Sequence, residues 1–159
     1  MIVIADTSPV NYLILIGEIE LLPQLYGRVI IPTMVLEELG AETAPAVVRE
    51  WVLAPPDWLE SRSSVNVIEK ELAELLDKGE SEAIQIASEL NADLLIIDEK
   101  LGRQIAVRRG LKIVGTIGIL ALAGERSLID VEKTVGKLEK TNFHVSSHLK
   151  EFLKKSKNS

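Results

Sequence analysis

The chain has 159 residues, of which 47% are hydrophobic and 26% are charged, with no Cys and a formal net charge of −6. A chain of this length buries roughly 70% of its unfolded surface when it folds, so it needs neither disulfides nor a structural metal. The lack of Cys excludes thiolate metal sites and thiol nucleophiles. No apolar run approaches the roughly 20 residues of a membrane span, so we expect a cytoplasmic protein with no membrane partner. The negative charge disfavours nucleic-acid binding unless cations intervene.

The first residues predict a strand followed by a helix. Residues 2–5 are a short β-branched apolar run, typical of a parallel strand that is buried on both faces. The run ends at Asp6. Thr7 and Ser8 then supply hydroxyl groups that can cap a helix, which apolar residues at helical spacing extend to Ile16. This is the strand, loop and helix unit of which α/β proteins are built.

The rest of the chain repeats this alternation. Further strands are expected at residues 28–31, 94–97 and 112–114. Further helices are expected over residues 18–26, 33–39, 44–53, 67–76, 79–90, 100–109 and 116–123. Residues 58–63 fit no pattern, and residues 125–159 form a helical, Lys-rich C-terminal extension. Strands that alternate with helices predict one α/β domain over residues 1–159, with a mostly parallel central sheet.

Two of the expected strands end at an acid. Asp6 follows the first strand, and Asp98 follows the strand at residues 94–97. In an open parallel sheet, ligands bind in the crevice beyond the carboxyl ends of the strands, so both acids are candidates for one site. Either acid could instead cap the helix that follows it. Because the pattern occurs twice, we favour the shared crevice.

Acids near the beginning of two helices could join this crevice. One expected helix carries Glu37 and Glu38, and another carries Glu80 and Glu82. Taken singly, Glu37, Glu80 and Glu82 are each better explained by the helix dipole and by exposure to solvent. Several carboxylates at short range cannot all ionise unless some are protonated or a divalent cation lies among them. A set of oxygen ligands favours Mg²⁺ or Mn²⁺.

Four motifs, in their order and spacing, resemble those of the PIN-domain family, metal-dependent ribonucleases that include the VapC-type toxins of toxin–antitoxin pairs. The motifs are Ile-Val-Ile-Ala-Asp-Thr-Ser at residues 2–8, Pro-Thr-Met-Val-Leu-Glu-Glu-Leu at 32–39, Gly-Glu-Ser-Glu-Ala-Ile at 79–84 and Leu-Leu-Ile-Ile-Asp-Glu at 94–99. The likeness runs from Met1 to about Gly124. The third motif, together with Gly-Thr-Ile-Gly-Ile-Leu at residues 115–120, looks like an uncharacterised, toxin-like branch of the family. The resemblance implies a three-layer α/β/α PIN-like fold.

The resemblance also implies four catalytic acids that bind metal, Asp6, Glu38, Glu80 and Asp98. Glu38 matches better than Glu37 because Glu38 directly precedes Leu39 in the motif. Many family members have Asp where this chain has Glu80, and Glu82 is a possible substitute. The implied cofactor is Mg²⁺ or Mn²⁺.

Further residues are expected to support the site. Ser8, with Thr7 beside it, is expected to hydrogen-bond an acid of the site or a metal-bound water. Lys100 and Arg103 lie one helical turn apart and could contact substrate phosphate, or could form an ordinary solvated helix face. Many family toxins have Asn or Asp a few residues after the fourth acid, whereas this chain has Glu99. Whether a fifth acid joins the site therefore stays open.

Other features favour structural roles. His144 and His148 are spaced four residues apart, as on one helix face, and are expected at the surface. Trp51 and Trp58 are expected to pack in a core or against a partner rather than to stack on bases. Four lysines near the end of the chain are expected to complement the carboxyl end of a helix: Lys150, Lys154, Lys155 and Lys157.

Competing functions fit the sequence less well. A phosphatase of the haloacid-dehalogenase type needs a second Asp two positions after the first, where this chain has Ser8, and we find no set of residues for a phospho-receiver. We therefore expect a Mg²⁺- or Mn²⁺-dependent endoribonuclease that cleaves single-stranded RNA, and the resemblance suggests the toxin of a toxin–antitoxin pair. From the resemblance we also expect a homodimer and an antitoxin segment in the acidic cleft. The alternative is a non-catalytic module that binds RNA or protein.

Overall fold

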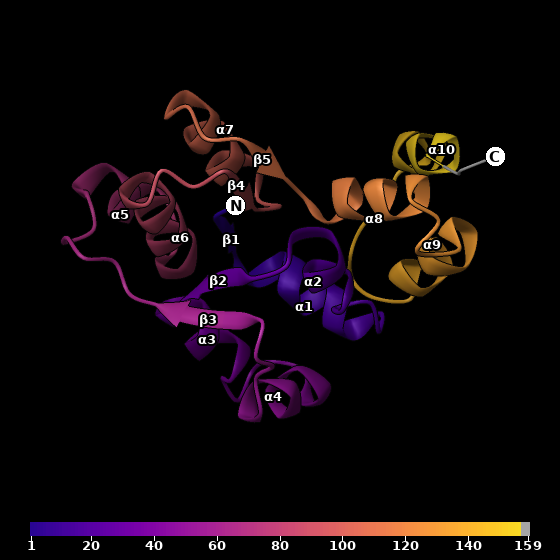
Figure 1. Ribbon diagram of the computed structural model, residues 1–159, viewed down its shortest axis with the longest axis horizontal. Helices are drawn as coiled ribbons and strands as arrows, with labels where there is room; N and C mark the ends of the chain where they lie inside the picture. Colours follow the sequence, from indigo (N-terminus) through magenta and orange to yellow (C-terminus); the bar gives the residue numbers. More distant parts are fainter. Residues whose placement is uncertain (157–159) are drawn as a thin grey trace.

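A parallel β-sheet lies at the centre of the computed structural model, which describes residues 1–156 (Figure 1). The sheet has five strands in the order β3-β2-β1-β4-β5, and every neighbouring pair is parallel. In chain order the strands are β1 (Val3–Ala5), β2 (Val29–Pro32), β3 (Leu59–Arg62), β4 (Leu94–Ile96) and β5 (Ile113–Val114). The predicted α/β class with a parallel central sheet is confirmed.

Helices cover both faces of the sheet and complete the predicted three-layer α/β/α fold. One face carries α1 (Thr7–Leu15), α2 (Leu21–Tyr26) and α8 (Thr116–Glu125), and the other carries α5 (Lys70–Leu75), α6 (Lys78–Glu89) and α7 (Lys100–Arg108). The remaining helices are α3 (Thr33–Leu39), α4 (Ala46–Leu53), α9 (Val131–Glu139) and α10 (Ser147–Lys155). None of the helices between residues 1 and 156 is long and apolar enough to cross a membrane.

The central strands divide their side chains between two hydrophobic cores. In β1, Val3 and Ala5 belong to the core beneath α1 and α8, whereas Ile4 belongs to the core beneath α6 and α7. In β4, Ile96 faces the first core and Leu95 the second. A strand that is buried on both faces needs an apolar residue at every position. The two uninterrupted apolar runs in the sequence therefore correspond to the middle of the sheet.

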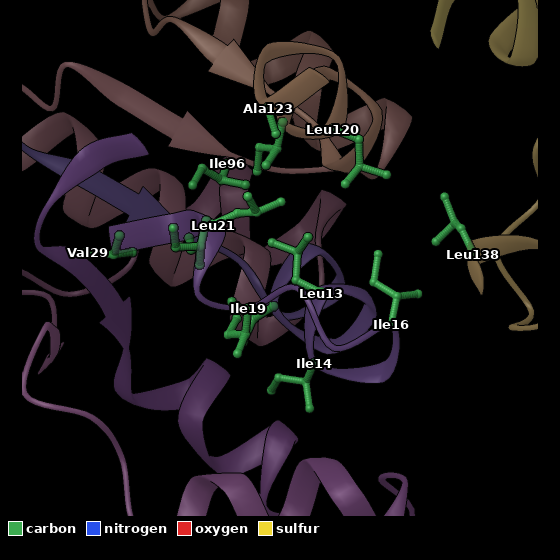
Figure 2. Packing of buried hydrophobic residues seen from close by; sticks show 14 of the residues in the cluster. Leu13, Ile14, Ile16, Ile19, Leu21, Val29, Ile96, Leu120, Ala123 and Leu138 are labelled. Atoms are coloured by element: carbon green, nitrogen blue, oxygen red, sulfur yellow. The ribbon is translucent and has the colours of Figure 1, made fainter. Parts of the chain in front are cut away.

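The larger core joins the first helices to the last ones (Figure 2). Leu13 of α1, Leu120 of α8 and Leu138 of α9 are buried in the same cluster. Trp51 and Trp58 pack against this cluster, with their ring centroids 6.1 Å apart. The expectation that the two tryptophans pack is confirmed.

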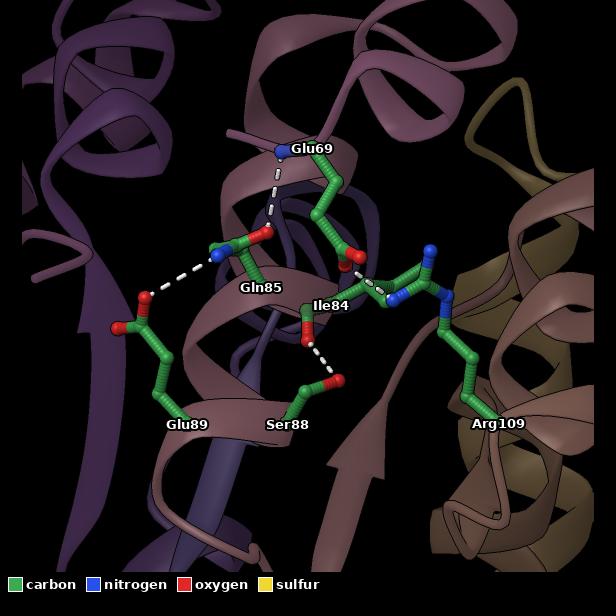
Figure 3. A network of polar contacts seen from close by, with 6 residues as sticks. All are labelled: Glu69, Ile84, Gln85, Ser88, Glu89 and Arg109. Carbon is green, nitrogen blue, oxygen red and sulfur yellow. Dashed lines mark hydrogen bonds and ion pairs between the residues drawn. The ribbon is translucent and has the colours of Figure 1, made fainter. Parts of the chain in front are cut away.

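Polar contacts tie α6 to its neighbours (Figure 3). The Gln85 side chain accepts a hydrogen bond from the Glu69 N–H at 3.2 Å and donates one to the Glu89 carboxylate at 3.1 Å. The Glu69 carboxylate in turn pairs with Arg109, just after α7. These contacts link α6 to the residue before α5 and to the end of α7. They help to fix the helix whose first turn carries Glu80.

Three stretches of the chain differ from expectation. The helix expected over residues 18–26 begins only at Leu21. Residues 58–63, which fit no pattern, include the edge strand β3, whose residues Leu-Glu-Ser-Arg are not buried and so lack an apolar signal. The helix expected over residues 67–76 begins only at Lys70, because Glu69 has an extended ψ of 139° and forms the N-cap.

The end of the described chain also differs from expectation. His144 precedes α10, so it does not share a helix face with His148 as their spacing predicted. Ser146 caps α10 instead, because its hydroxyl accepts the Leu149 N–H at 3.2 Å. Lys154 lies in the last turn of α10, where the helix dipole favours a cation, and Lys157 lies outside the described residues.

Candidate functional site

A cavity of about 500 Å³ lies beyond the carboxyl ends of β1 and β4. We call it the acid cavity because six acids line it: Asp6, Glu38, Asp77, Glu80, Asp98 and Glu99. Its wall also includes Thr7, Ser8 and Tyr12, and three leucines. The structure thus brings together the four acids predicted from the sequence, with Asp77 and Glu99 in addition. Carboxylates from two strand ends and two helices meet there, as expected for a parallel sheet.

Asp6 is held at the end of β1 and is almost fully buried. Its side chain is 3% exposed, and its N–H donates to the Ile96 carbonyl at 2.9 Å. Although Asp6 is the N-cap residue of α1, its side chain makes no capping hydrogen bond. Its Oδ1 atom is buried and has no hydrogen-bond partner among the described residues. Burial raises the pKa of Asp6 to about 7, an effect that the Thr7 N–H opposes and that the charges of Asp77 and Glu38 reinforce.

Glu80 faces the same cavity from the first turn of α6. Glu80 is 7% exposed, and its Oε2 atom is likewise buried without a hydrogen-bond partner in residues 1–156. Burial raises the pKa of Glu80 to about 8, and Asp77 contributes next, ahead of the charges of Asp6 and Glu99. We call Asp6 Oδ1 and Glu80 Oε2 the open oxygens.

Glu38 approaches the cavity from α3, and both of its carboxylate oxygens accept hydrogen bonds. The Thr7 hydroxyl donates to Oε2 at 2.5 Å, and the Gly79 N–H donates to Oε1 at 3.1 Å. The sequence suggested that Thr7 caps the first helix, and this was wrong. Thr7 is already the first residue of α1, because Asp6 has extended backbone angles, and its hydroxyl orients Glu38 instead.

Asp98 follows β4 and is bound to the start of α8. The Thr116 N–H donates to Oδ1 and the Thr116 hydroxyl donates to Oδ2, each at 2.7 Å. The Ser8 hydroxyl lies 3.4 Å from Oδ2, in line with the expectation that it contacts an acid. Asp98 does not cap α7. Glu99 is the N-cap residue there, and its carboxylate accepts the Leu101 N–H at 3.3 Å.

Glu82, the possible substitute for Glu80, lies outside the acid cavity. Its carboxylate accepts hydrogen bonds from the Thr33 hydroxyl at 3.0 Å and from the Met34 N–H at 2.9 Å. Both donors belong to the first turn of α3, so Glu82 satisfies the start of that helix. Glu37 is exposed on α3 and is not part of the cavity wall formed by the described residues.

The two basic residues proposed for phosphate contact lie beside the cavity rather than in it. Arg103 donates to the Ile97 carbonyl at 2.8 Å and lines a neighbouring hollow that it shares with Asp98. Lys100 is exposed at the beginning of α7. Neither belongs to the wall of the acid cavity as residues 1–156 form it.

Sequence reasoning missed Asp77 and the role of Thr116. Asp77 is the N-cap residue of α6, and its carboxylate accepts the Glu80 N–H at 2.8 Å. An Asp three residues before a Glu is the spacing of a helix start, so a capping pattern could have revealed Asp77. Thr116 lies in a quoted motif, but no local pattern connects it with an acid 18 residues earlier.

The donor set of the acid cavity fits a hard divalent cation. The open oxygens are buried, and they belong to two acids that line a space shared with other carboxylates and whose pKa values are raised by burial. Oxygen donors of this kind suit Mg²⁺ or Mn²⁺. Within residues 1–156 no three acids or histidines are already arranged around a common point as metal ligands, so an ion would draw the carboxylates inward.

The comparisons with known proteins agree with this architecture. The family model described as PIN domain matches residues 2–158, well past the stretch that carries the sequence resemblance. No curated protein and no solved structure matches the chain significantly. PIN domains are in general nucleases, and they typically use divalent metals and act on nucleic acid. Because the match spans nearly the whole sequence, the chain belongs to the PIN-domain family.

Proposed function

We propose that this protein is a Mg²⁺- or Mn²⁺-dependent endoribonuclease that cleaves phosphodiester bonds of single-stranded RNA. One observation carries the proposal. Two buried carboxylates, Asp6 and Glu80, each have an open oxygen, and both residues line a cavity that they share with Glu38 and Asp98. A buried carboxylate is costly unless it is protonated, paired or bound to a cation. In a family of nucleases, a bound cation is the partner that would explain why both open oxygens are buried without a hydrogen bond.

Asp6, Glu38, Glu80 and Asp98 would hold the metal and are the proposed catalytic residues. A bound divalent cation supplies a Lewis acid that neutralises charge on the scissile phosphate and lowers the pKa of an attacking water. The open oxygens are the atoms best placed to bind, since no other group of the described chain competes for them. Glu38 and Asp98, which also line the cavity, would complete the donor set.

The supporting residues orient two of these acids. Thr7 and the Gly79 N–H fix the Glu38 carboxylate, while Thr116 fixes Asp98 with Ser8 nearby. Such hydrogen bonds from a second layer of residues hold metal ligands in their binding orientation. They also lower the number of rotamers that must be frozen when an ion binds.

The charge of the cavity makes substrate binding depend on the cation. Without an ion, a phosphodiester would meet a wall of carboxylates on a protein of net charge −6. With an ion, the local charge reverses and attracts phosphate. Lys100 and Arg103 lie close to this region on α7 and are our candidates for phosphate contacts outside the cavity.

The proposal extends to partners that the family resemblance suggests. We propose a homodimer, and an antitoxin whose segment occupies the acid cavity if the protein acts as a toxin. Leu75 and Leu101 are exposed at the rim of the cavity and offer apolar contacts to such a segment. Sedimentation analysis over a wide concentration range tests the dimer, which a monomer at every concentration would remove.

The central test is a calorimetric titration of Mn²⁺ into the purified protein, with RNA cleavage measured on the same samples. The variants are Asp6→Asn and Glu80→Gln, and the control is Glu37→Gln, which changes an exposed acid next to Glu38. We expect binding and cleavage to disappear together in the first two and to persist in the control. Cleavage that survives excess EDTA would reject metal dependence. A wild-type protein that binds no Mn²⁺ would make the non-catalytic module the better account.

A further inference from the structure

Three glycines from three different segments lie directly against carboxylates of the acid cavity. A Cβ atom added to each would approach a carboxylate oxygen to less than 3.0 Å, a separation that real Cβ atoms essentially never show. The separations would be 2.7 Å from Gly79 to Glu38 Oε1, 2.9 Å from Gly102 to Glu80 Oε2, and 2.7 Å from Gly115 to Asp98 Oδ1. Each glycine therefore leaves free the space beside the carboxylate, which a Cβ at that position would crowd.

Backbone conformation does not explain why these positions are glycine. The described glycines with left-handed backbone are Gly17, Gly27 and Gly110, and these turns do favour glycine. Gly79 and Gly102 lie instead within α6 and α7, where alanine is the better helix former. At the start of α8, Gly115 has a φ of −106°, which any residue adopts. The missing side chain, rather than the backbone, is what distinguishes these three positions.

We propose that Gly79, Gly102 and Gly115 are positioning residues for the metal site. The absence of a Cβ at each position sets how deeply the adjacent carboxylate lies, and so sets the size and shape of the ion site. We call these residues the cradle glycines. This inference rests on the proposed function, because it concerns the cation that the acid cavity is proposed to bind.

The crowded atoms explain why substitution of Gly79 should alter the site and spare the fold. At Gly79 the three nearest atoms all belong to the Glu38 carboxyl group, at 2.7, 3.0 and 3.1 Å. These atoms are the end of a long side chain, which can turn aside when a methyl group is added, at the expense of its hydrogen bonds to Thr7 and to the Gly79 N–H. The backbone need not move. At Gly102, by contrast, the added Cβ would lie 2.8 Å from Cδ1 of the fully buried Ile97 and 2.9 Å from the open oxygen of Glu80, so alanine there crowds the core as well as the site.

The effects at the cradle glycines should differ in kind. Alanine at position 102 would press on an open oxygen, an atom proposed to bind the ion itself. Alanine at position 115 would press on Asp98, whose short side chain is already held by Thr116 and has little freedom to turn. We therefore expect the loss of affinity at these two positions to be at least as large as at Gly79.

Mn²⁺ affinity, measured by calorimetry, tests the inference. We expect Gly79→Ala, Gly102→Ala and Gly115→Ala to weaken binding about 10- to 100-fold, as other changes behind metal ligands do. Two controls separate this effect from alanine substitution in general. Gly118→Ala crowds an apolar neighbour, with its Cβ 2.6 Å from Val114 Cγ2. Gly136→Ala crowds nothing, since its Cβ would meet no described atom within 4 Å apart from its chain neighbours and the backbone of its own helix. Both control variants should bind within about twofold of wild type.

A second measurement without metal keeps the inference separate from the proposed function. Thermal unfolding is compared for wild type, Gly79→Ala, Glu38→Ala and the double variant. Once the Glu38 carboxylate is removed, alanine at position 79 meets no obstacle and should raise the unfolding midpoint more than it does in wild type. Effects that simply add would overturn the inference, because Gly79 would then not act through Glu38.

The outcomes are distinguishable. If wild type binds no Mn²⁺, the proposed function fails, and the unfolding comparison still decides whether Gly79 and Glu38 are coupled. If wild type binds Mn²⁺ and the three variants bind equally well, the cradle glycines do not position the ligands and the inference fails while the proposed function stands. Weaker binding in the control variants as well would also reject it, since the effect would then be general.

Discussion

Thr116 donates two hydrogen bonds to Asp98, one from its backbone N–H and one from its hydroxyl, each 2.7 Å long. Thr116 is fully buried and is the first residue of α8, while Asp98 is the second residue after the end of β4. The two residues are 18 positions apart in the sequence. The start of one helix thus fixes an acid that lies near the end of a strand. A change at the start of α8 can therefore alter the position of Asp98 in the acid cavity.

We predict that Thr116→Val lowers both stability and metal affinity. Valine keeps the shape and the N–H but removes the hydroxyl donor, and a lost hydrogen bond to a charged group costs about 1.5–3 kcal/mol. Thr116→Ser retains the donor and is the matched control. Denaturant unfolding and Mn²⁺ calorimetry measure the two effects. Equal values for the valine and serine variants would show that the hydroxyl does not hold Asp98.

Removing the charge of Asp6 should stabilise the protein when metal is absent. Burial raises the pKa of Asp6 to about 7, so at pH 8 the folded protein carries an ionised carboxylate in an unfavourable environment. We expect Asp6→Asn to raise the free energy of unfolding by about 2–4 kcal/mol at pH 8 in EDTA. Urea unfolding provides the measurement. A destabilised variant would mean that the Asp6 carboxylate is satisfied in the metal-free protein.

Stability without metal should fall as the pH rises from about 4 to about 8. The folded pKa of Asp6 is about 7 and that of Glu80 about 8, against ordinary values of 3.8 and 4.5. Between these limits the folded state holds protons that the unfolded state releases, so the free energy of unfolding declines with pH. Chemical unfolding at a series of pH values should show this decline. Saturating Mn²⁺ should reverse it, and a flat profile in EDTA would contradict the prediction.

Glu80 and Glu82 should respond oppositely to the same substitution. Glu80 has an open oxygen and an unfavourable charge, so Glu80→Gln should stabilise the metal-free protein. Glu82 accepts two hydrogen bonds at the start of α3, so Glu82→Gln should destabilise it by about 1 kcal/mol or more. Unfolding of both variants at pH 8 in EDTA makes the comparison. Shifts of the same sign would mean that the two environments are not distinct.

The central strands could be predicted because their burial requires a local sequence pattern, an uninterrupted apolar run. A strand covered on both faces must be apolar at each position, as in Val3–Ala5 and Leu94–Ile96. The edge strand Leu59–Arg62 has no such run, since its side chains are partly exposed. Its place in the sheet follows from pairing with β2, which lies far away in the sequence.

The candidate site could be predicted only in part for a similar reason. Asp6 and Asp98 stand at strand ends, where topology alone brings acids together. Glu80 and Glu82 are two residues apart on one helix and so point about 200° away from each other. Only the packing of α6 decides which of them enters the acid cavity. Thr116 acts on a partner that only the folded chain brings within reach, whereas Asp77 accepts the N–H of nearby Glu80, so its capping pattern is local.

Two hydrogen-bonded links make α3 and α6 a single unit. Glu82 of α6 binds the first turn of α3, and the Gly79 N–H binds Glu38 near the other end of α3. The acid cavity is therefore a seam between two bodies, with Asp6 and Asp98 on the sheet and Glu38 and Glu80 on the helix pair. A cation bound there would link the acids on the sheet to the acids on the helix pair. Amide hydrogen exchange should then slow in α3 and α6 when Mn²⁺ is added. The amides of the interior strands are already protected, so their exchange rates should change little.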